Sequence, residues 1–257
     1  SFYIFNQSIL GYPVTTPNGT SIFDNRRIDI NKSGDRMVHG GYSWSDVFIY
    51  TLVNNEWVIS DTIDRPVSST NFGYSVSISD DGNIIAVGDP ALHGNIPPVY
   101  NGGPYRKVYI YQYDGSSWNQ KGSALESTEG RFGEVIELSG NGEYLSVSDP
   151  ESGVNDYGNV TTYKYFSGVN QWTAVTSFTN PTGAGYYRFG HTISLNYEGD
   201  IIAIGNPFKN QHVGEVKIYS NGVNGGSLIG FINGVGNYPT GSDGFGASVS
   251  LNSEGDR

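Results

Sequence analysis

Apolar and small polar residues alternate with a period of two in many short segments of the chain. The clearest segment is 75–79, where the apolar residues Val76 and Ile78 stand between serines. Such alternation is typical of a β-strand whose two faces differ. A turn with Asp81 and Gly82 follows, and residues 84–87 are then apolar on both faces, as in a strand covered on both sides. The pattern predicts a strand, a tight turn and a second strand.

This unit recurs along the chain at intervals of 48 to 60 residues, measured between the glycines of its turn. Those glycines are Gly34, Gly82, Gly142, Gly199 and Gly255. A third strand follows in each complete copy, and three copies then have a fourth strand with a tryptophan (Trp57, Trp118 and Trp172). We expect these tryptophans to pack against a neighbouring blade. Four strands in a repeat of this length are typical of one propeller blade.

The expected fold is therefore all-β, a single β-propeller of four-stranded antiparallel blades over residues 1–257, with about five blades represented. Because one blade cannot bury two apolar faces alone, we expect adjacent blades to stack. The approximate blades are 1–22 (partial), 23–66, 67–127, 128–183, 184–240 and 241–257 (partial). Two arrangements stay open. The ends would close a five-bladed ring, or the chain is an excerpt of a larger ring, which we favour because a closing blade would lack its second strand.

Two short motifs mark the strand pair. Phe72-Gly73 opens the first strand of one copy, and Gly88-Asp89-Pro90 closes its second strand. Two further copies keep the pattern, Phe132-Gly133 with Ser148-Asp149-Pro150 and Phe189-Gly190 with Gly205-Asn206-Pro207. The first copy has drifted, with Asp24-Asn25 in place of Phe-Gly. These motifs resemble the FG-GAP repeat of integrin α-subunit propellers and their relatives.

The resemblance implies a ring, most often of seven blades, with the Phe-Gly strand innermost. It also implies that the loops between second and third strands share one rim with those between fourth and first strands, and that this rim binds ligand in integrins. The longest such loop here is 91–106, whose candidate contacts are His93, Tyr100, Tyr105 and Arg106. An inert insertion is the alternative.

Calcium is the one cofactor to consider, because many integrin blades carry an Asp-rich loop between the first two strands. The nearest candidates are Asn196, Glu198 and Asp200, but their spacing is not that of a one-loop calcium site, and a tight hairpin is favoured. No other cofactor is expected. Four segments match the N-glycosylation sequon, at Asn6, Asn18, Asn31 and Asn159. We expect His39, which lies in a second strand, to be a core residue.

Composition narrows the function further. The net charge of −11 and the lack of a basic stripe argue against nucleic-acid binding. The chain has no cysteine, and no apolar run approaches the ~18 residues of a membrane helix. Acidic residues recur as turn residues, so no catalytic pair stands out, and there is no Gly-x-Ser-x-Gly elbow.

The sequence thus favours a non-catalytic structural or adhesion protein, placed outside the cell, on the cell surface or on a virion surface. Its expected partners are other proteins or surface glycans, including copies of itself or other subunits of an assembly. The alternative is a secreted carbohydrate-binding or carbohydrate-active propeller that uses its central pore.

Overall fold

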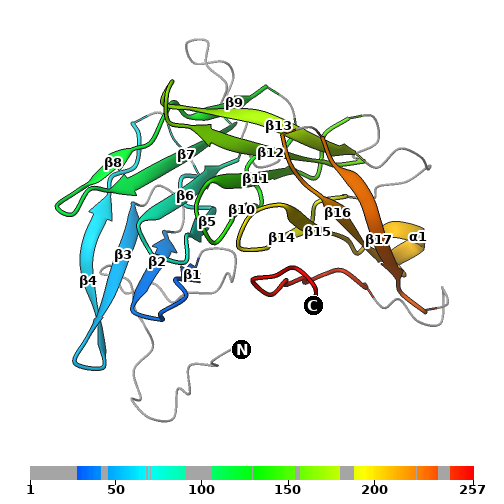
Figure 1. Cartoon of the computed structure of the whole chain (residues 1–257), viewed down its shortest axis with the longest axis horizontal. Helices are drawn as coiled ribbons and strands as arrows, with labels where there is room; N and C mark the ends of the chain where they lie inside the picture. The colour runs from blue at the N-terminus through cyan, green and yellow to red at the C-terminus, as the bar shows by residue number, and fades with distance from the viewer. Residues whose placement is uncertain are drawn as a thin grey trace.

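The computed structural model describes residues 28–41, 46–67, 69, 71–90, 106–128, 130–153, 157–179, 188–223, 225–236 and 244–257. The regular structure is almost entirely β and forms four antiparallel sheets. These sheets are arranged side by side around a common centre, with their first strands innermost (Figure 1). The expected β-propeller of four-stranded blades is confirmed.

The four sheets, numbered here as blades 1 to 4, follow one another along the chain. Blade 1 contains β1 (Ile28–Ile30), β2 (Arg36–Gly40), β3 (Val47–Val53) and β4 (Glu56–Ile63). Blade 2 contains β5 (Ser75–Ile78), β6 (Ile84–Asp89), β7 (Arg106–Tyr113), β8 (Trp118–Gln120) and β9 (Leu125–Ser127). Blade 3 contains β10 (Ile136–Leu138), β11 (Tyr144–Asp149), β12 (Asn159–Phe166) and β13 (Gln171–Thr179). Blade 4 contains β14 (Thr192–Leu195), β15 (Ile201–Asn206), β16 (Glu215–Ser220) and β17 (Ser227–Asn233).

Three features lie outside this simple scheme, the first being that two short strands of blade 2, β8 and β9, both pair with β7. A four-residue segment labelled α1 (Lys209–His212) stands between β15 and β16, and it is a turn in which Asn210 and Gln211 have left-handed backbone angles (φ 51° and 60°) rather than a regular helix. Residues 244–257 form the first-strand segment and turn of a fifth repeat and bridge to blade 4 through Gly214 and Phe245. Residues 1–6, which would decide between the two ring arrangements, lie outside the described residues.

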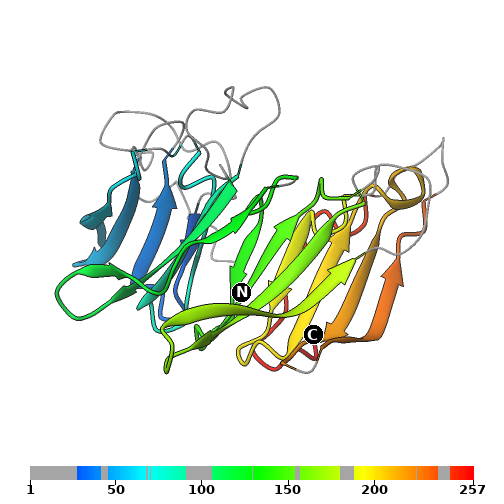
Figure 2. The same ribbon diagram turned by 90° about the horizontal axis from the view of Figure 1, so that it is seen from above.

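The strands run between two edges of the molecule (Figure 2). We call one edge the rim: second strands end there, at Gly40, Asp89, Asp149 and Asn206, and third strands begin. We call the opposite edge the turn edge, because the hairpin turns between first and second strands lie there. In all five repeats the turn glycine has a positive φ, as Gly82 does at +73°, which confirms the predicted tight hairpins.

The apolar cores lie between blades rather than within them. One core joins Ile49 and Ile63 of blade 1 to Phe72 and Ile85 of blade 2, and two more join blades 2 to 3 and 3 to 4. Two of the fourth-strand tryptophans follow the same rule: Trp118 packs on the core between blades 1 and 2, and Trp172 of blade 3 donates a hydrogen bond from Nε1 to the Lys121 carbonyl of blade 2 at 3.0 Å. Burying one large apolar side chain contributes roughly 1.5–3 kcal/mol, so stacking dominates the stability.

Each blade is joined to the next by a glycine contact at the rim. A Cβ on Gly88 of blade 2 would clash with the carbonyl oxygen of Gly133 in blade 3, and one on Gly205 would clash with Gly246. Gly40 of blade 1 makes the same contact with Gly73 of blade 2. The first copy of the repeat therefore has the contact glycine at this position although its other motif residues have changed. These are the glycines of the Gly-Asp-Pro and Phe-Gly motifs, and the motifs therefore mark the places where backbones meet.

At three junctions a hydroxyl group donates a hydrogen bond to the carbonyl of the Phe-Gly glycine of the next blade, and the donor lies on either the first or the second strand. Ser75, the β5 partner of Gly88, donates to the Gly133 carbonyl at 2.7 Å, and Thr192, the β14 partner of Gly205, donates to Gly246 at 2.8 Å. In blade 3 the corresponding first-strand residue is Val135, which has no hydroxyl. There Ser148, in the glycine position of β11, donates to the Gly190 carbonyl at 2.5 Å. The Ser-for-Gly replacement therefore moves the donor and keeps the bond.

The face of blade 4 that lies away from blade 3 shows how much apolar surface blade stacking buries elsewhere. Ile63, Leu125 and Phe178 pair with the first valine of the third strand in their blades and are 5–8% exposed, because the following blade lies over them. Ile232 has the same position in blade 4 but is 52% exposed. Among the described residues, no complete sheet covers this face.

The glycine contact generates a stability prediction. Gly88→Ala should destabilise the protein by about 1–3 kcal/mol or more, because the methyl group forces blades 2 and 3 apart. Gly230→Ala in β17 is the matched control, since nothing lies within 4 Å of its added Cβ, and it should change stability by about 0.5 kcal/mol or less. Urea denaturation measures both, and equal effects would contradict the contact.

Candidate functional site

The inner strands of all five repeats meet around one cavity of about 190 Å³ near the turn edge. The cavity is lined by one equivalent residue from each inner strand, the residue between the two apolar positions. These five residues are Asp29, Ser77, Glu137, Ser194 and Ser250. We call this space the axial cavity. The Phe-Gly strands are therefore innermost, as the resemblance to FG-GAP repeats implied.

The polar side chains of the axial cavity also hold adjacent inner strands together. Asp29 accepts a hydrogen bond from the backbone N–H of Ile78 in the next blade at 2.8 Å. Ser77 accepts one from Leu138 at 3.0 Å, and Ser194 accepts one from Leu251 at 3.1 Å. A serine hydroxyl thus does this structural work without any charge. That makes the two carboxyl groups the unusual members of the ring.

The two acids carry perturbed pKa values. Burial raises the pKa of Asp29 to about 6, although hydrogen bonds from the backbone of Ile78 and Ile30 act in the opposite direction. Burial, and secondly the charge of Asp29, raise the pKa of Glu137 well above its usual range. Perturbed acids that share a cavity are characteristic of functional sites. Sequence reasoning missed this pair because it treated each acid as a turn or strand residue.

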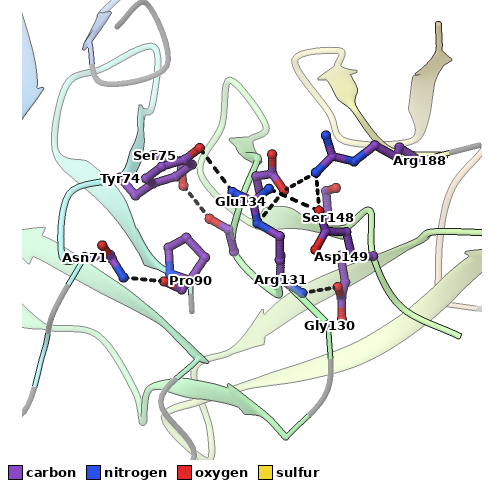
Figure 3. A network of polar contacts seen from close by, with 12 residues as sticks. Asn71, Tyr74, Ser75, Pro90, Gly130, Arg131, Glu134, Ser148, Asp149 and Arg188 are labelled. Carbon is purple, nitrogen blue, oxygen red and sulfur yellow. Dashed lines mark hydrogen bonds and ion pairs between the residues drawn. The ribbon is translucent and has the colours of Figure 1, made fainter. Parts of the chain in front are cut away.

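A second polar cluster lies at the rim, where blades 2, 3 and 4 meet (Figure 3). Arg131 and Arg188, which both precede a Phe-Gly motif, converge on the buried Glu134 at 3.2 and 3.9 Å. Both also pair with Glu151. We call these four residues the rim cluster. Its ion pairs link the segments that lead into blades 3 and 4 and so hold this part of the rim together. Because its two positive and two negative charges balance, it leaves little net charge there.

Asp149 stands beside the rim cluster and anchors the Phe-Gly turn. Its Oδ1 accepts the backbone N–H of Arg131 at 2.6 Å, as Asp89 accepts that of Asn71 at 2.8 Å in blade 2. Burial raises the pKa of Asp149 to about 6, against the effect of the Arg131 N–H. The Asp of the Gly-Asp-Pro motif therefore has a structural role in the described blades.

The predicted ligand loop is only partly visible. His93, Tyr100 and Tyr105 lie outside the described residues. Arg106 begins β7, and its guanidinium donates to the backbone carbonyls of Gly130 at 2.5 Å and Thr128 at 3.0 Å. The root of the loop is thus fixed to the segment that leads into blade 3.

The calcium candidates do not form one cage. Asn196 and Asp200 bond to each other at 2.7 Å, and Asn196 Oδ1 accepts the backbone N–H of Ile201 at 3.0 Å. Glu198 is directed away, toward the side-chain amide of Asn141 in blade 3 at 3.1 Å. Among the described residues, no group of three or more His, Cys, Asp or Glu side chains is placed to hold a metal ion.

The same lock closes the turn of every repeat. The residue at the end of the first strand accepts a backbone N–H from five residues later, as Ser79 does from Ile84 at 3.0 Å and Asn252 does from Arg257 at 3.3 Å. Where this residue is Asn, it also donates to an Asp four residues later, and where it is Ser, it donates to an Asp or Asn two residues later. The recurrent turn acids therefore have a structural role.

Two of the four sequons are in the described chain. Asn31 is 5% exposed, and its Nδ2 donates to Ser33 and Asp35 in the turn lock, so a glycan on this atom would require the turn to open. Asn159 begins β12 at the rim, half-buried, and its Oδ1 accepts from the Thr161 hydroxyl. Asn6 and Asn18 lie outside the described residues. His39 is buried in β2, as expected.

Comparisons with known proteins bear on the fold. No family model matches the chain, and no curated protein matches it. Among solved structures it is similar to a protein from Lactobacillus plantarum (TM-score 0.52, 16% identity, covering 80% of this chain and 56% of that one). It is also similar to a hypothetical selenium-binding protein from Sulfolobus tokodaii (TM-score 0.55, 9% identity, 86% and 57%). The chain spans a little over half the length of each.

At these identities the likeness concerns the propeller fold alone. The chain has the architecture of both structures, and its chemistry must be argued from its own residues. No helix in the described part of the chain is both long and apolar enough to cross a membrane.

The raised pKa of Asp149 predicts a pH dependence. Because its folded pKa lies above the unfolded value of 3.8, its effect on stability is most favourable below pH 4 and is lost as the pH rises through about 6. Asp149→Asn keeps an oxygen acceptor for Arg131, as Asn206 does by residue type in blade 4. The variant should therefore lose less stability between pH 4 and 6.5, by about 1–3 kcal/mol. Denaturation curves at both pH values measure this, and parallel losses in the two proteins would contradict it.

Proposed function

We propose that this chain is a non-catalytic propeller scaffold that binds protein or glycan partners through its rim loops. The observation that carries the proposal is the construction of the rim. The rim cluster, the Gly-Asp-Pro anchors and the glycine contacts all fix the rim at the points from which its loops leave. A rigid base lowers the entropic cost of binding through loops.

The setting of this scaffold follows from the sequence. The resemblance of its Phe-Gly and Gly-Asp-Pro motifs to FG-GAP repeats suggests adhesion, because the rim binds ligand in integrins. The lack of cysteine, the net charge of −11 and the richness in Tyr, Asn and Gly favour a place outside the cell or on a particle surface. In this function the partner is another protein, a surface glycan or a subunit of the same assembly.

Replacing residues 91–105 with a Gly-Ser linker of equal length tests the proposal. Binding to a glycan microarray or to a panel of purified extracellular proteins should fall at least tenfold, while the thermal midpoint stays within a few degrees, because none of the described strands includes residues 91–105. Asn55→Gly in the β3–β4 turn, at the opposite edge, is the matched control and should bind like the unchanged protein. Equal binding by the loop variant, or no binding to either panel, would contradict the proposal.

One observation favours the second candidate, a carbohydrate-active or carbohydrate-binding pore. Asp29 and Glu137 both line the axial cavity, and both have raised pKa values. Two carboxyl groups, one of them protonated, are what glycoside hydrolysis requires. Against it, the cavity of about 190 Å³ is smaller than most ligand pockets, which measure roughly 300–1,000 Å³.

Assays on a polysaccharide panel decide between the two candidates. The scaffold predicts no release of reducing sugar by the unchanged protein. Hydrolysis that is abolished by Glu137→Gln, and equally by Asp29→Asn, would favour the pore instead.

A further inference from the structure

We infer that the axial cavity binds one partly hydrated divalent cation of the Mg²⁺ class through the carboxylates of Asp29 and Glu137. This inference goes beyond the proposed scaffold function and does not depend on it. It concerns a place in the fold that is distinct from the turn candidates Asn196, Glu198 and Asp200.

The first step is the unusual chemistry of one position. In three of the five inner strands the residue that faces the axis is serine, and Ser77 and Ser194 each accept a backbone N–H of the next blade. Asp29 does the same for Ile78. This structural task therefore needs an oxygen acceptor but no charge. A carboxyl group at this position brings a desolvation cost that serine would avoid.

The second step is the lack of any partner for Glu137. No described residue donates a hydrogen bond to its carboxyl group, and the side chain is surrounded by protein but partly accessible where it lines the axial cavity. Buried carboxyl groups are almost always hydrogen-bonded or paired with a cation. An unpartnered acid that faces a cavity beside a second acid points to a ligand that supplies positive charge.

The third step is the charge around the cavity. A third acid, Asp80, lines the cavity where it meets the turn edge, but it is already paired with Lys32 at 3.1 Å. The same lysine also reaches Ser253 of the fifth repeat at 3.4 Å. Lys32 therefore closes over the turn edge of the axis and neutralises Asp80. No ion pair of the described chain involves Asp29 or Glu137, so these two acids of the cavity have no cationic partner among the described residues.

The fourth step is the kind of cation that fits. The side chains that line the cavity offer oxygen ligands for a metal, namely the carboxylates of Asp29 and Glu137, that of Asp80 paired with Lys32, and the serine hydroxyls, and such ligands suit hard cations. A water molecule takes about 30 Å³ in the liquid, so a cavity of about 190 Å³ has room for an ion that keeps several of its waters. Mg²⁺ commonly binds in this way, through one or two carboxylates. With so few charged ligands, the expected Kd is on the order of 10⁻⁴–10⁻³ M.

The test is equilibrium binding of Mn²⁺, used as a spectroscopic probe by electron paramagnetic resonance, with competition by Mg²⁺. The unchanged protein should bind one Mn²⁺ that Mg²⁺ displaces, and 5 mM MgCl₂ should raise its Tm by about 4 °C over KCl of equal ionic strength. Glu137→Gln and Asp29→Asn should each weaken Mn²⁺ binding at least tenfold.

Two further variants keep the test decisive. Glu137→Ser introduces the residue found at three of the equivalent positions and should fold normally while losing the bound ion. Glu198→Gln, in an exposed turn outside the cavity, is the control and should bind like the unchanged protein. The inference is overturned if the unchanged protein binds no Mn²⁺, if several equivalent ions bind, or if the Glu137 variants bind as tightly as the control.

Discussion

The structure depends on a close backbone contact between neighbouring blades. At each described junction along the rim, the last or penultimate residue of a second strand lies directly against the glycine that precedes the next inner strand. At three of the junctions a hydroxyl group bonds to the carbonyl of that glycine. The contact holds the blades near enough for their large apolar residues to pack between sheets. At Gly88 even a methyl group would clash with the Gly133 carbonyl and would separate the apolar cores on which stability rests.

The same contact explains where polar and charged side chains are brought together. Because adjacent inner strands are held closely together, five equivalent residues face one axis and enclose a small cavity rather than a wide channel. At the other edge, the rim cluster and the Asp149 anchor surround the junctions of blades 2, 3 and 4. The molecule therefore has a stiff frame with two polar regions, an acidic one on the axis and a charge-balanced one at the rim.

Much of this frame could be predicted from the sequence, because short stretches of each repeat determine its strands and turns. Period-two alternation, the turn glycines and the Phe-Gly motif each follow from the geometry of one strand pair. The placement of Asp29 and Glu137 in one cavity could not be predicted, since it depends on how far each blade rotates about the axis. Its only signal was an acid at a position where other copies have serine. The tight hairpin at Asn196 and Asp200 could be predicted, because the bond between these two residues is a local lock within one turn.

A double-mutant cycle on Val135 and Ser148 tests the blade contact most directly. Ser148→Gly removes the hydroxyl from the Gly190 carbonyl, and Val135→Ser in the same chain restores the Ser–Gly arrangement of blade 2. The account predicts that the two substitutions are not additive. The unfolding free energy of the double variant should exceed the value expected from adding the two single effects by a coupling energy of about 1 kcal/mol, measured by urea denaturation. Additivity of the two changes would contradict the claim that this hydroxyl bond joins the blades.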